Sequence, residues 1–278
     1  MTPTQRRDAG APARLWSQRH LILQLVRRDV SGRYKGSFGG AAWAVLTPML
    51  MLAVYLFVFG VVFNPRRAAA GAAPMSAADL SAFGISLFCG MLVHGLFSEC
   101  LTRAPAVIVG QPAYVKRIVF PLEILPLVTV GAALFHFGVG LVVLLAGAAL
   151  FGTPPGWHLL ALPLVVVPLL LLSAGVTWLF SALAVYLRDI GQLTGLLATV
   201  LLFLSPVFYP LDALPQDLRW LAIANPLSIP IEATRDLLLR GRMPDLTVLA
   251  GYWAACAVVA RLGLLWFEKT RRGFADVL

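Results

Sequence analysis

Long apolar runs separated by short polar connections dominate the chain. At a rise of 1.5 Å per residue, about 20 residues cross the hydrocarbon core of a bilayer. Most of the runs reach this length, and the shortest one ends at Ser205-Pro206, where we expect irregular structure. The pattern predicts an all-α integral membrane protein with six transmembrane helices, at residues 41–63, 80–97, 124–151, 159–186, 193–209 and 246–267.

Residues 14–31 precede the first predicted span and have the periodicity of an amphipathic helix. At 100° per residue, their apolar side chains cover about 220° of arc. We therefore expect an N-terminal interface helix in the cytoplasmic headgroup region, with Trp16 at headgroup depth. Such a helix is either a simple anchor or a lever that a cytoplasmic partner pushes. Four glycines within residues 32–40 allow the chain to turn into the first span.

The connection between the fifth and sixth spans contains six prolines within residues 205–245. Two short helical pieces, 217–224 and 229–239, lie between these prolines, and their charges nearly balance. Irregular backbone at membrane depth is tolerated only where protein buries it or where it lines a wet cavity. The pattern predicts re-entrant helices that form an outer vestibule or gate, in preference to a passive outer cap. The expected organisation is a cytoplasmic tail with the interface helix (1–40), a transmembrane domain (41–267) and a cytoplasmic C-terminal tail (268–278).

Composition agrees with this membrane prediction. Of the 278 residues, 59% are hydrophobic and 13% are charged, whereas soluble domains carry about 25% charged residues. Basic residues number 15 on the side of the two termini and 6 on the other side. The excess predicts that both termini are cytoplasmic. The net charge of +9 is therefore first a signal of topology, and we do not expect nucleic-acid binding.

Motifs for catalysis, metal binding and nucleotide binding are absent from the sequence. The three cysteines show no CxxC spacing, and no phosphate-binding loop, zinc-protease motif or serine-hydrolase elbow occurs. We expect no metal site, no cofactor and no catalytic residue, so that any driven work takes its energy from another subunit or an ion gradient. His94 and His136 lack an acidic partner on their own spans, so we expect hydrogen bonds to neighbouring helices more than proton relays.

Two further segments have open interpretations. The second connection, from Arg103 to Pro121, is either an interfacial loop or a short cytoplasmic docking helix. On the first span, Tyr55, Phe59 and Phe63 follow one another at intervals of four and share one helix face. This stripe faces lipid or packs against protein by default, although sugar rings also stack well on aromatic faces.

Several motifs occur in the order found in one family. The sequence closely resembles the permeases of ABC-2 type exporters that carry polysaccharides. The matching motifs are RDVSGRYKGS (28–37), WAVLTPM (43–49), VKRIVFPLEILP (115–126), YLRDI (186–190), SPVFYP (205–210), NPLS (225–228) and GFADVL (273–278). Together these motifs extend from about residue 25 to the C-terminus.

The resemblance implies a homodimer of six-span subunits, paired with two copies of a separate cytoplasmic ATPase that binds ATP and magnesium. The pattern is most similar to O-antigen and lipopolysaccharide exporters, with teichoic-acid exporters nearby and capsule exporters similar in layout. The implied substrate is a glycan on an undecaprenyl-pyrophosphate lipid, exported across the bacterial inner membrane. The interface helix of the family corresponds to residues 15–31, and its re-entrant helices correspond to residues 211–240.

We assign three sets of candidate residues on this basis. The substrate path is expected to include Tyr55, Phe59, Phe203, Phe208 and Tyr209. The entrance for the pyrophosphate is expected to include Arg27, Arg28, Arg33 and Lys35, although membrane orientation alone also explains these cations. Coupling to the ATPase is expected to involve Arg28, Asp29, Tyr114, Lys116 and Arg117.

Two alternatives remain open at the level of sequence. An ABC-2 permease for a small drug or lipid would not need a wide aromatic path. A membrane enzyme of glycolipid assembly would turn over without an ATPase, and the missing catalytic motifs argue against it.

Overall fold

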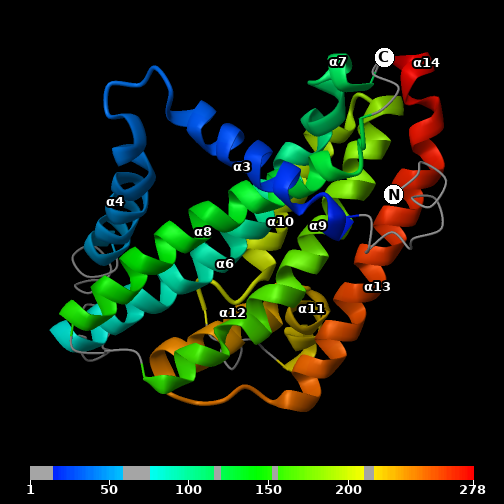
Figure 1. Ribbon diagram of the computed structural model, residues 1–278. Helices are drawn as coiled ribbons and strands as arrows, with labels where there is room; N and C mark the ends of the chain where they lie inside the picture. Colours follow the sequence, from blue (N-terminus) through cyan, green and yellow to red (C-terminus); the bar gives the residue numbers. More distant parts are fainter. Residues whose placement is uncertain (1–14, 59–75, 116–119, 152–155, 210–215) are drawn as a thin grey trace.

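The computed structural model describes residues 15–58, 76–115, 120–151, 156–209 and 216–278. These residues fold into helices joined by short turns, without a β-strand in the described part of the chain (Figure 1). The all-helical prediction is therefore confirmed. The long helices are α4 (Trp43–Phe57), α6 (Ala77–Val109), α8 (Ile124–Leu150), α9 (Leu162–Tyr186), α10 (Ile190–Leu204) and α13 (Leu246–Thr270).

Five of the helical segments described are long and apolar enough to cross a membrane. They are Gly40–Phe57, Asp79–Val109, Ile124–Leu150, Trp157–Tyr186 and Leu246–Val277. The predicted fifth span corresponds to α10, an apolar helix of 15 residues, which is about 22 Å long and shorter than a hydrocarbon core. The multi-span character is thus confirmed, while the count of six stays a prediction.

The short length of α10 has a local cause in the sequence. The residue before a proline is driven out of the helical region by the proline ring, and Ser205 accordingly takes extended backbone angles, with φ −80° and ψ 149°. The helix therefore ends at Leu204. The irregular structure expected at Ser205-Pro206 is confirmed.

Helix α6 continues past the end expected for the second span, and this is a correction to the predicted connection. Arg103 lies inside α6, which runs through Pro105 to Val109. The residues after Pro105 are again apolar, and the charge of Arg103 is matched by carboxylates described below. The loop therefore begins only after Val109, and the short helix α7 (Pro112–Val115) follows it.

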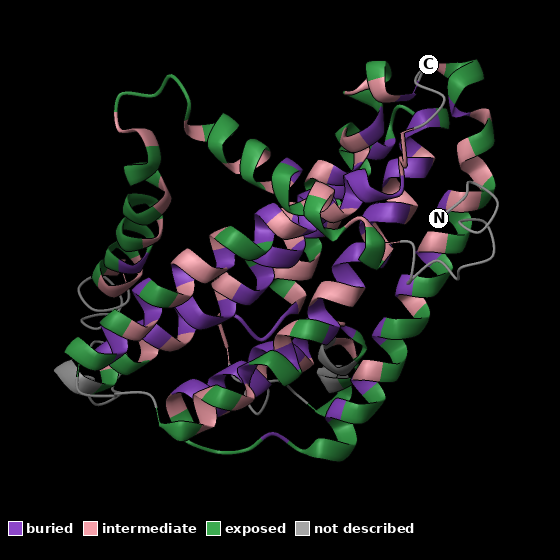
Figure 2. Ribbon diagram, viewed as in Figure 1, coloured by how far each residue is buried: buried purple, intermediate pink, exposed green. Residues whose placement is uncertain are grey.

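Helices α6, α8 and α9 form the centre of the molecule. Helix α9 packs most extensively on α13 and α6, and α8 packs on α6 (Figure 1). Figure 2 shows the buried residues concentrated on these central helices, whereas α4 is largely exposed along its length. Helix α4 contacts only α6 and α8 to any extent beyond its own N-terminal turn.

Close backbone contact joins α9 and α13. A Cβ atom added to Gly263 would lie 2.1 Å from the carbonyl oxygen of Gly175. Small residues allow membrane helices to approach in this way. The C-terminal end of α13 is covered by α14 (Phe274–Val277), whose Phe274 is fully buried beside Phe267.

Helix α3 (Arg19–Tyr34) is the segment predicted as the interface helix. It crosses α8 and packs against it. Leu25 of α3 is buried together with Ile124 and Val128 of α8. The apolar face of α3 is therefore covered, at least in part, by protein.

The segment between α10 and α13 contains short helices at nearly the predicted positions. They are η5 (Gln216–Leu218), α11 (Arg219–Ala224), α12 (Ser228–Arg235) and the π-helical turn η6 (Asp236–Arg240). Helix α12 packs on α6. The two short helices are confirmed, and their depth in the membrane stays a prediction.

Candidate functional site

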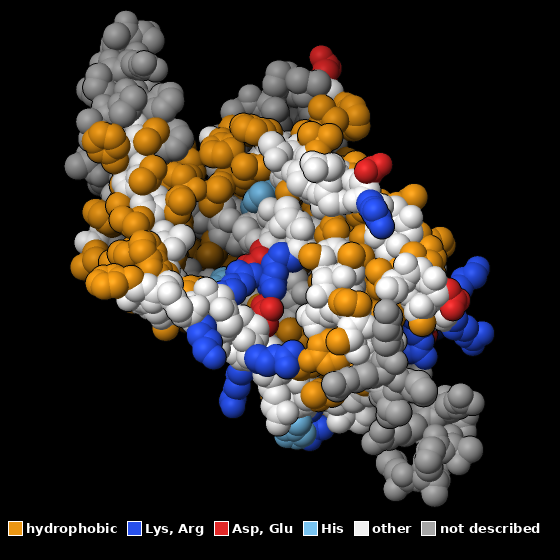
Figure 3. Space-filling model, turned by 90° about the horizontal axis from the view of Figure 1, so that it is seen from above, with side chains coloured by type: hydrophobic (Ala, Val, Ile, Leu, Met, Phe, Trp, Pro, Cys, Tyr) orange, Lys and Arg blue, Asp and Glu red, His pale blue; other side chains and the backbone are white. Residues whose placement is uncertain are grey.

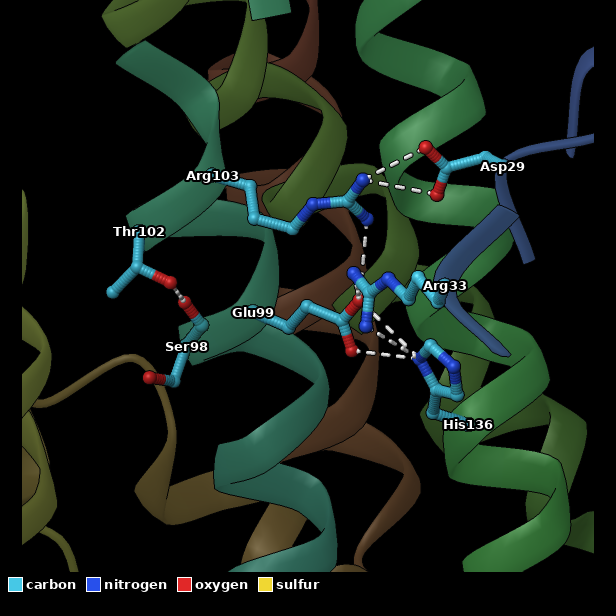
Figure 4. A network of polar contacts seen from close by, with 7 residues as sticks. All are labelled: Asp29, Arg33, Ser98, Glu99, Thr102, Arg103 and His136. Carbon is cyan, nitrogen blue, oxygen red and sulfur yellow. Dashed lines mark hydrogen bonds and ion pairs between the residues drawn. The ribbon is translucent and has the colours of Figure 1, made fainter. Parts of the chain in front are cut away.

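Two ion pairs fasten α3 to α6. Nη2 of Arg103 donates to both carboxylate oxygens of Asp29, at 2.9 Å each, and Arg33 forms an ion pair with Glu99 (Figure 4). Asp29 and Arg33 are four residues apart on α3, as are Glu99 and Arg103 on α6. Side chains at this spacing share a helix face, so each helix presents one acid and one base to the other. We call this arrangement the α3–α6 clamp.

Glu99 is the central residue of the clamp because three side chains converge on it. Besides Arg33, Nη1 of Arg103 approaches Oε1 at 3.3 Å, and Nδ1 of His136 on α8 lies 3.0 Å from Oε2. Nδ1 of His136 also lies 3.4 Å from Arg33. The clamp therefore joins α3, α6 and α8 (Figure 4).

His136 and His94 follow the expectation for lone histidines in membrane helices. Nε2 of His94 lies 3.1 Å from the carbonyl oxygen of Ala198 on α10. The acidic partner of His136 is Glu99, which lies on the neighbouring helix α6 and not on α8 itself. The Nε2 atom of His136 is buried without a partner among the described residues.

The coupling candidates divide into separate contacts. Nη2 of Arg28 donates to the hydroxyl of Tyr114 on α7 at 2.7 Å, and the Tyr114 ring packs on Phe120 at a centroid distance of 4.4 Å. Asp29 contacts α6 instead, through the clamp. Thus α3 contacts both α6 and α7, whereas Lys116 and Arg117 lie outside the described residues.

A cavity of about 400 Å³ lies beside the clamp, between α4, α6 and α8. Arg33, Glu99, His136 and Thr47 line it with polar side chains, and mostly apolar and aromatic side chains line the rest. In Figure 3, acidic and basic side chains lie beside a hollow between the α4 side and the remainder of the molecule. The tyrosine at the end of α3, Tyr34, also lines this cavity, and burial raises the pKa of its hydroxyl.

The predicted path residues fall into two groups. Tyr55 lines the cavity, and its ring lies 6.5 Å from that of Phe88. Phe203 and Phe208 stack at 5.9 Å at the end of α10, where the hydroxyl of Tyr209 donates to the carbonyl of Phe203. Helix α4 packs on α6 and α8, whereas α10 packs on α6 and α9. Tyr55 and the α10 aromatics thus lie on different flanks of α6, and Phe59 lies outside the described residues.

The predicted entrance cations are also divided. Arg28 and Arg33 are engaged by Tyr114 and Glu99. Arg27 and Lys35 instead line a second, open groove between α3, α4 and α8. Their predicted role in binding a pyrophosphate stays a prediction.

Sequence reasoning missed the clamp partners Glu99 and Arg103 and a buried arginine in the segment between α10 and α13. Arg235 of α12 is 5% exposed. It donates to the carbonyls of Pro206, Val207 (2.8 Å) and Ser86 (3.2 Å) and pairs with Glu232 at 2.8 Å. The four-residue spacing of opposite charges, at 29 and 33 and again at 99 and 103, was an available signal for the clamp. No comparable spacing reveals the carbonyl contacts of Arg235.

Asn225 connects the segment between α10 and α13 to the end of α10. Its side-chain amide donates to the carbonyl of Leu201 at 3.2 Å and to the hydroxyl of Ser205 at 2.9 Å. Its Oδ1 accepts from the backbone N–H of Leu227. The hydrogen bond from Asn225 to Ser205 therefore joins the NPLS motif to the SPVFYP motif.

This bundle of long apolar helices, joined by a charged clamp, is that of a multi-span membrane protein. The ABC-2 type transporter family matches residues 20–239, so the chain belongs to that family. Similar proteins include the O-antigen export system permease protein RfbA of Myxococcus xanthus, 28% identical over 94% of this chain and 96% of the relative. A permease of the same name from Klebsiella pneumoniae is 24% identical over 93% of this chain and 95% of the relative. The polysialic acid transport protein KpsM of Escherichia coli is 24% identical over 91% of this chain and 94% of the relative.

Proposed function

We propose that the chain is the membrane subunit of an ATP-driven exporter of polysaccharide, of the O-antigen type. The observation that carries the proposal is the α3–α6 clamp in a chain of the ABC-2 type transporter family with O-antigen export permeases among its relatives. The substrate is a lipid-linked glycan, moved from the cytoplasm across a bacterial inner membrane. Two copies of this subunit act with two copies of a cytoplasmic ATPase, which binds ATP and magnesium.

Six spans with both termini in the cytoplasm fit this role. The basic excess on the side of the termini supports the orientation. Helix α10 counts as the fifth span, completed on its outer side by α11 and α12. In support, Arg235 of α12 donates to the carbonyl of Ser86 in α6. Ser86 lies nine residues after Ala77, so this contact is about 13 Å along α6 from its N-terminal end.

The proposed coupling route runs through α3. The ATPase contacts the exposed side of α3 and the α7 region, and its closure moves both. Asp29 and Arg33 pass that movement to α6, and His136 passes it to α8. Since charged pairs of this kind hold two helices in a fixed register, α3 and the central helices move together.

The glycan path uses the aromatic side chains of α4 and of the α10 end. Because Tyr55 and the Phe203–Phe208 pair lie on different flanks of α6 within one chain, they line one path only if two subunits contribute. This division supports a homodimeric channel. Sugar rings would slide over these aromatic faces without strong hydrogen bonds that hold them in place.

The path is tested with the Tyr55→Ala variant in cells that export the glycan. We expect a loss of surface glycan, measured by quantitative lectin or antibody binding, at wild-type permease levels. Phe57→Ala is the matched control, because Phe57 lies on the same helix, is 58% exposed and does not line the cavity. Equal export by wild type and Tyr55→Ala would contradict the polysaccharide path and favour a smaller substrate.

A further inference from the structure

An open groove of about 680 Å³ lies between α3, the start of α4 and the middle of α8. We call it the interface groove. It is separate from the cavity beside the clamp, although Tyr34 and Ala44 contribute to both. One wall belongs to α3 and the residue after it, and the opposite wall includes Val45 of α4 and Phe135 and Val139 of α8.

The α3 wall of the groove consists of one polar row and one apolar row. Arg27, Ser31 and Lys35 follow each other at intervals of four, and so do Val26, Val30 and Tyr34. Side chains four residues apart lie above one another on a helix. A line of two cations and a hydroxyl therefore runs directly beside a line of apolar side chains.

The two cations of the groove are available to a ligand. Arg27 and Lys35 are exposed, and no lining residue of the groove is acidic. Within the described part of the chain, no ion pair or side-chain hydrogen bond engages either one. The neighbouring cations differ, because Arg28 is bonded to Tyr114 and Arg33 to Glu99.

The opposite wall faces the bilayer. Phe135 of α8 is 43% exposed and Val45 of α4 is 45% exposed, although both are apolar and lie on helices apolar enough to cross a membrane. About 20 residues cross the hydrocarbon core, and counting them back from Leu150 at the end of α8 places its inner boundary near residue 131. Phe135 and Val139 therefore lie just inside the hydrocarbon, below the level of a headgroup.

We propose that the interface groove binds an anionic phospholipid of the cytoplasmic leaflet. Its phosphate lies against Arg27 and Lys35, Ser31 donates a hydrogen bond to it, and an acyl chain follows Phe135, Val139 and Val45. Basic pockets between membrane helices on the cytoplasmic side bind anionic headgroups. This proposal goes beyond the export function and depends only on the membrane orientation.

A phospholipid suits the groove better than the lipid-linked substrate does. The groove opens to the bilayer along Phe135 and Val45, where phospholipids greatly outnumber any biosynthetic intermediate. Occupancy would also have a mechanical consequence. Helices α3 and α4 are joined only by the turn at residues 35–42, which includes Gly36 and Gly40 with φ of +87° and +48°. A lipid that contacts both helices fixes the angle between them.

The test uses the full-length chain purified in a neutral detergent, with fluorescent phosphatidylglycerol as the probe and anisotropy as the readout. Each cation near a headgroup strengthens anionic lipid binding about fivefold. We therefore expect the Arg27→Gln/Lys35→Gln variant to bind phosphatidylglycerol roughly 25-fold more weakly. Arg19→Gln/Arg242→Gln is the matched control, because it removes the same charge outside the groove.

A second variant separates binding from folding. Ser31→Glu places an anion between the two cations, so we expect it to abolish phosphatidylglycerol binding while the thermal unfolding temperature in neutral detergent stays unchanged. Neutral phosphatidylcholine is expected to bind wild type and all variants equally weakly. The assay contains no ATPase and no glycan, so its failure is distinguishable from failure of the export function.

Three results would overturn the proposal. The first is equal loss of phosphatidylglycerol binding in the groove variant and in the Arg19→Gln/Arg242→Gln control. The second is wild-type binding by Ser31→Glu. The third is displacement of phosphatidylglycerol by equimolar undecaprenyl pyrophosphate, which would make the groove a substrate entrance. Failure of inorganic phosphate to displace the probe supports a requirement for the lipid chain.

Discussion

Individual charged side chains carry unusually large structural roles in a chain with so few of them. Glu99, for example, is approached by Arg33, Arg103 and His136, which come from three helices. In water such pairs contribute little, but charges that are partly withdrawn from solvent interact more strongly. The positions of these few side chains therefore determine how the helices are held together.

Arg235 gives the sharpest test at the residue scale. Its guanidinium satisfies three backbone carbonyls and Glu232 at once. An ammonium group cannot reproduce this planar fork of donors, so Arg235→Lys leaves at least one buried carbonyl unpaired, and we expect it to lower the free energy of unfolding by about 1–3 kcal/mol. Thermal unfolding of the purified chain measures the change.

Arg240→Lys provides the control for this prediction. Arg240 also pairs with Glu232, but its side chain is 44% exposed, so we expect a change of less than about 1 kcal/mol. If the two lysine variants unfold at the same temperature, Arg235 does not hold the segment between α10 and α13 in place.

Through Asp245, the cap at the start of α13 is expected to make the stability of the protein depend on pH. The backbone N–H groups of Thr247 and Val248 donate to its carboxylate, at 2.7 and 3.3 Å, and lower its pKa. The stabilisation by a carboxylate with a lowered pKa is present above the unfolded value and is lost as the pH falls below about 4. We expect the unfolding temperature of the wild type to fall more between pH 6 and pH 3 than that of Asp245→Asn. Parallel pH profiles of the two proteins would contradict this account of the cap.

At the scale of elements, the α9–α13 pair is held by contact between glycines. A methyl group on Gly263 would collide with the backbone of Gly175, so Gly263→Ala must push the helices apart. We expect a loss of about 1–3 kcal/mol in stability. Gly251→Ala on the same helix is the control, because a Cβ atom there meets nothing within 4 Å. Equal unfolding temperatures for the two alanine variants would show that the crossing tolerates a side chain.

The sequence predicted the long apolar helices well, because hydrophobic length is set by the bilayer and can be counted. Proline positions likewise predicted the break after Leu204 and the two short helices near 217–224 and 229–239. Which element covers the apolar face of a helix, however, is decided only by the tertiary fold. Helical periodicity placed an amphipathic helix before the first span, but only the fold shows that Leu25 is buried against α8.

The candidate site could be predicted only in part for the same reason. Arg28 and Tyr114 were both named for coupling, and they form a hydrogen bond. Glu99 was overlooked because it lies just after a predicted span end, and its partners on other helices, Arg33 and His136, are 66 and 37 residues away in the chain. The extension of α6 beyond residue 97 was obscured by Arg103 and Pro105, which are poor span residues but are tolerated in a helix paired with α3.

At the scale of the whole molecule, α11 and α12 lie at one end of the bundle, and α7 and α14 lie at the other (Figure 1). Helices α3, α7 and α14 lie toward the end of the bundle that holds the C-terminus (Figure 1). There Arg271 pairs with Glu123 at 2.9 Å, joining the C-terminal region to the start of α8. Helix α6 connects the two ends, because it contacts α3 by way of the clamp and α12 by way of Arg235. This continuity is the basis of the proposed coupling.

The most direct measurement of this claim is ATP-dependent transfer of a lipid-linked glycan into proteoliposomes that contain the chain and its ATPase. We expect Asp29→Arg and Arg103→Asp each to lower glycan transfer at least tenfold while ATP hydrolysis continues. The double variant Asp29→Arg/Arg103→Asp should recover a large part of the transfer, with Glu99 limiting full recovery. The account would be contradicted if both single variants transferred as much glycan per ATP hydrolysed as the wild type does. Glycan transfer in the absence of the ATPase would contradict it as well.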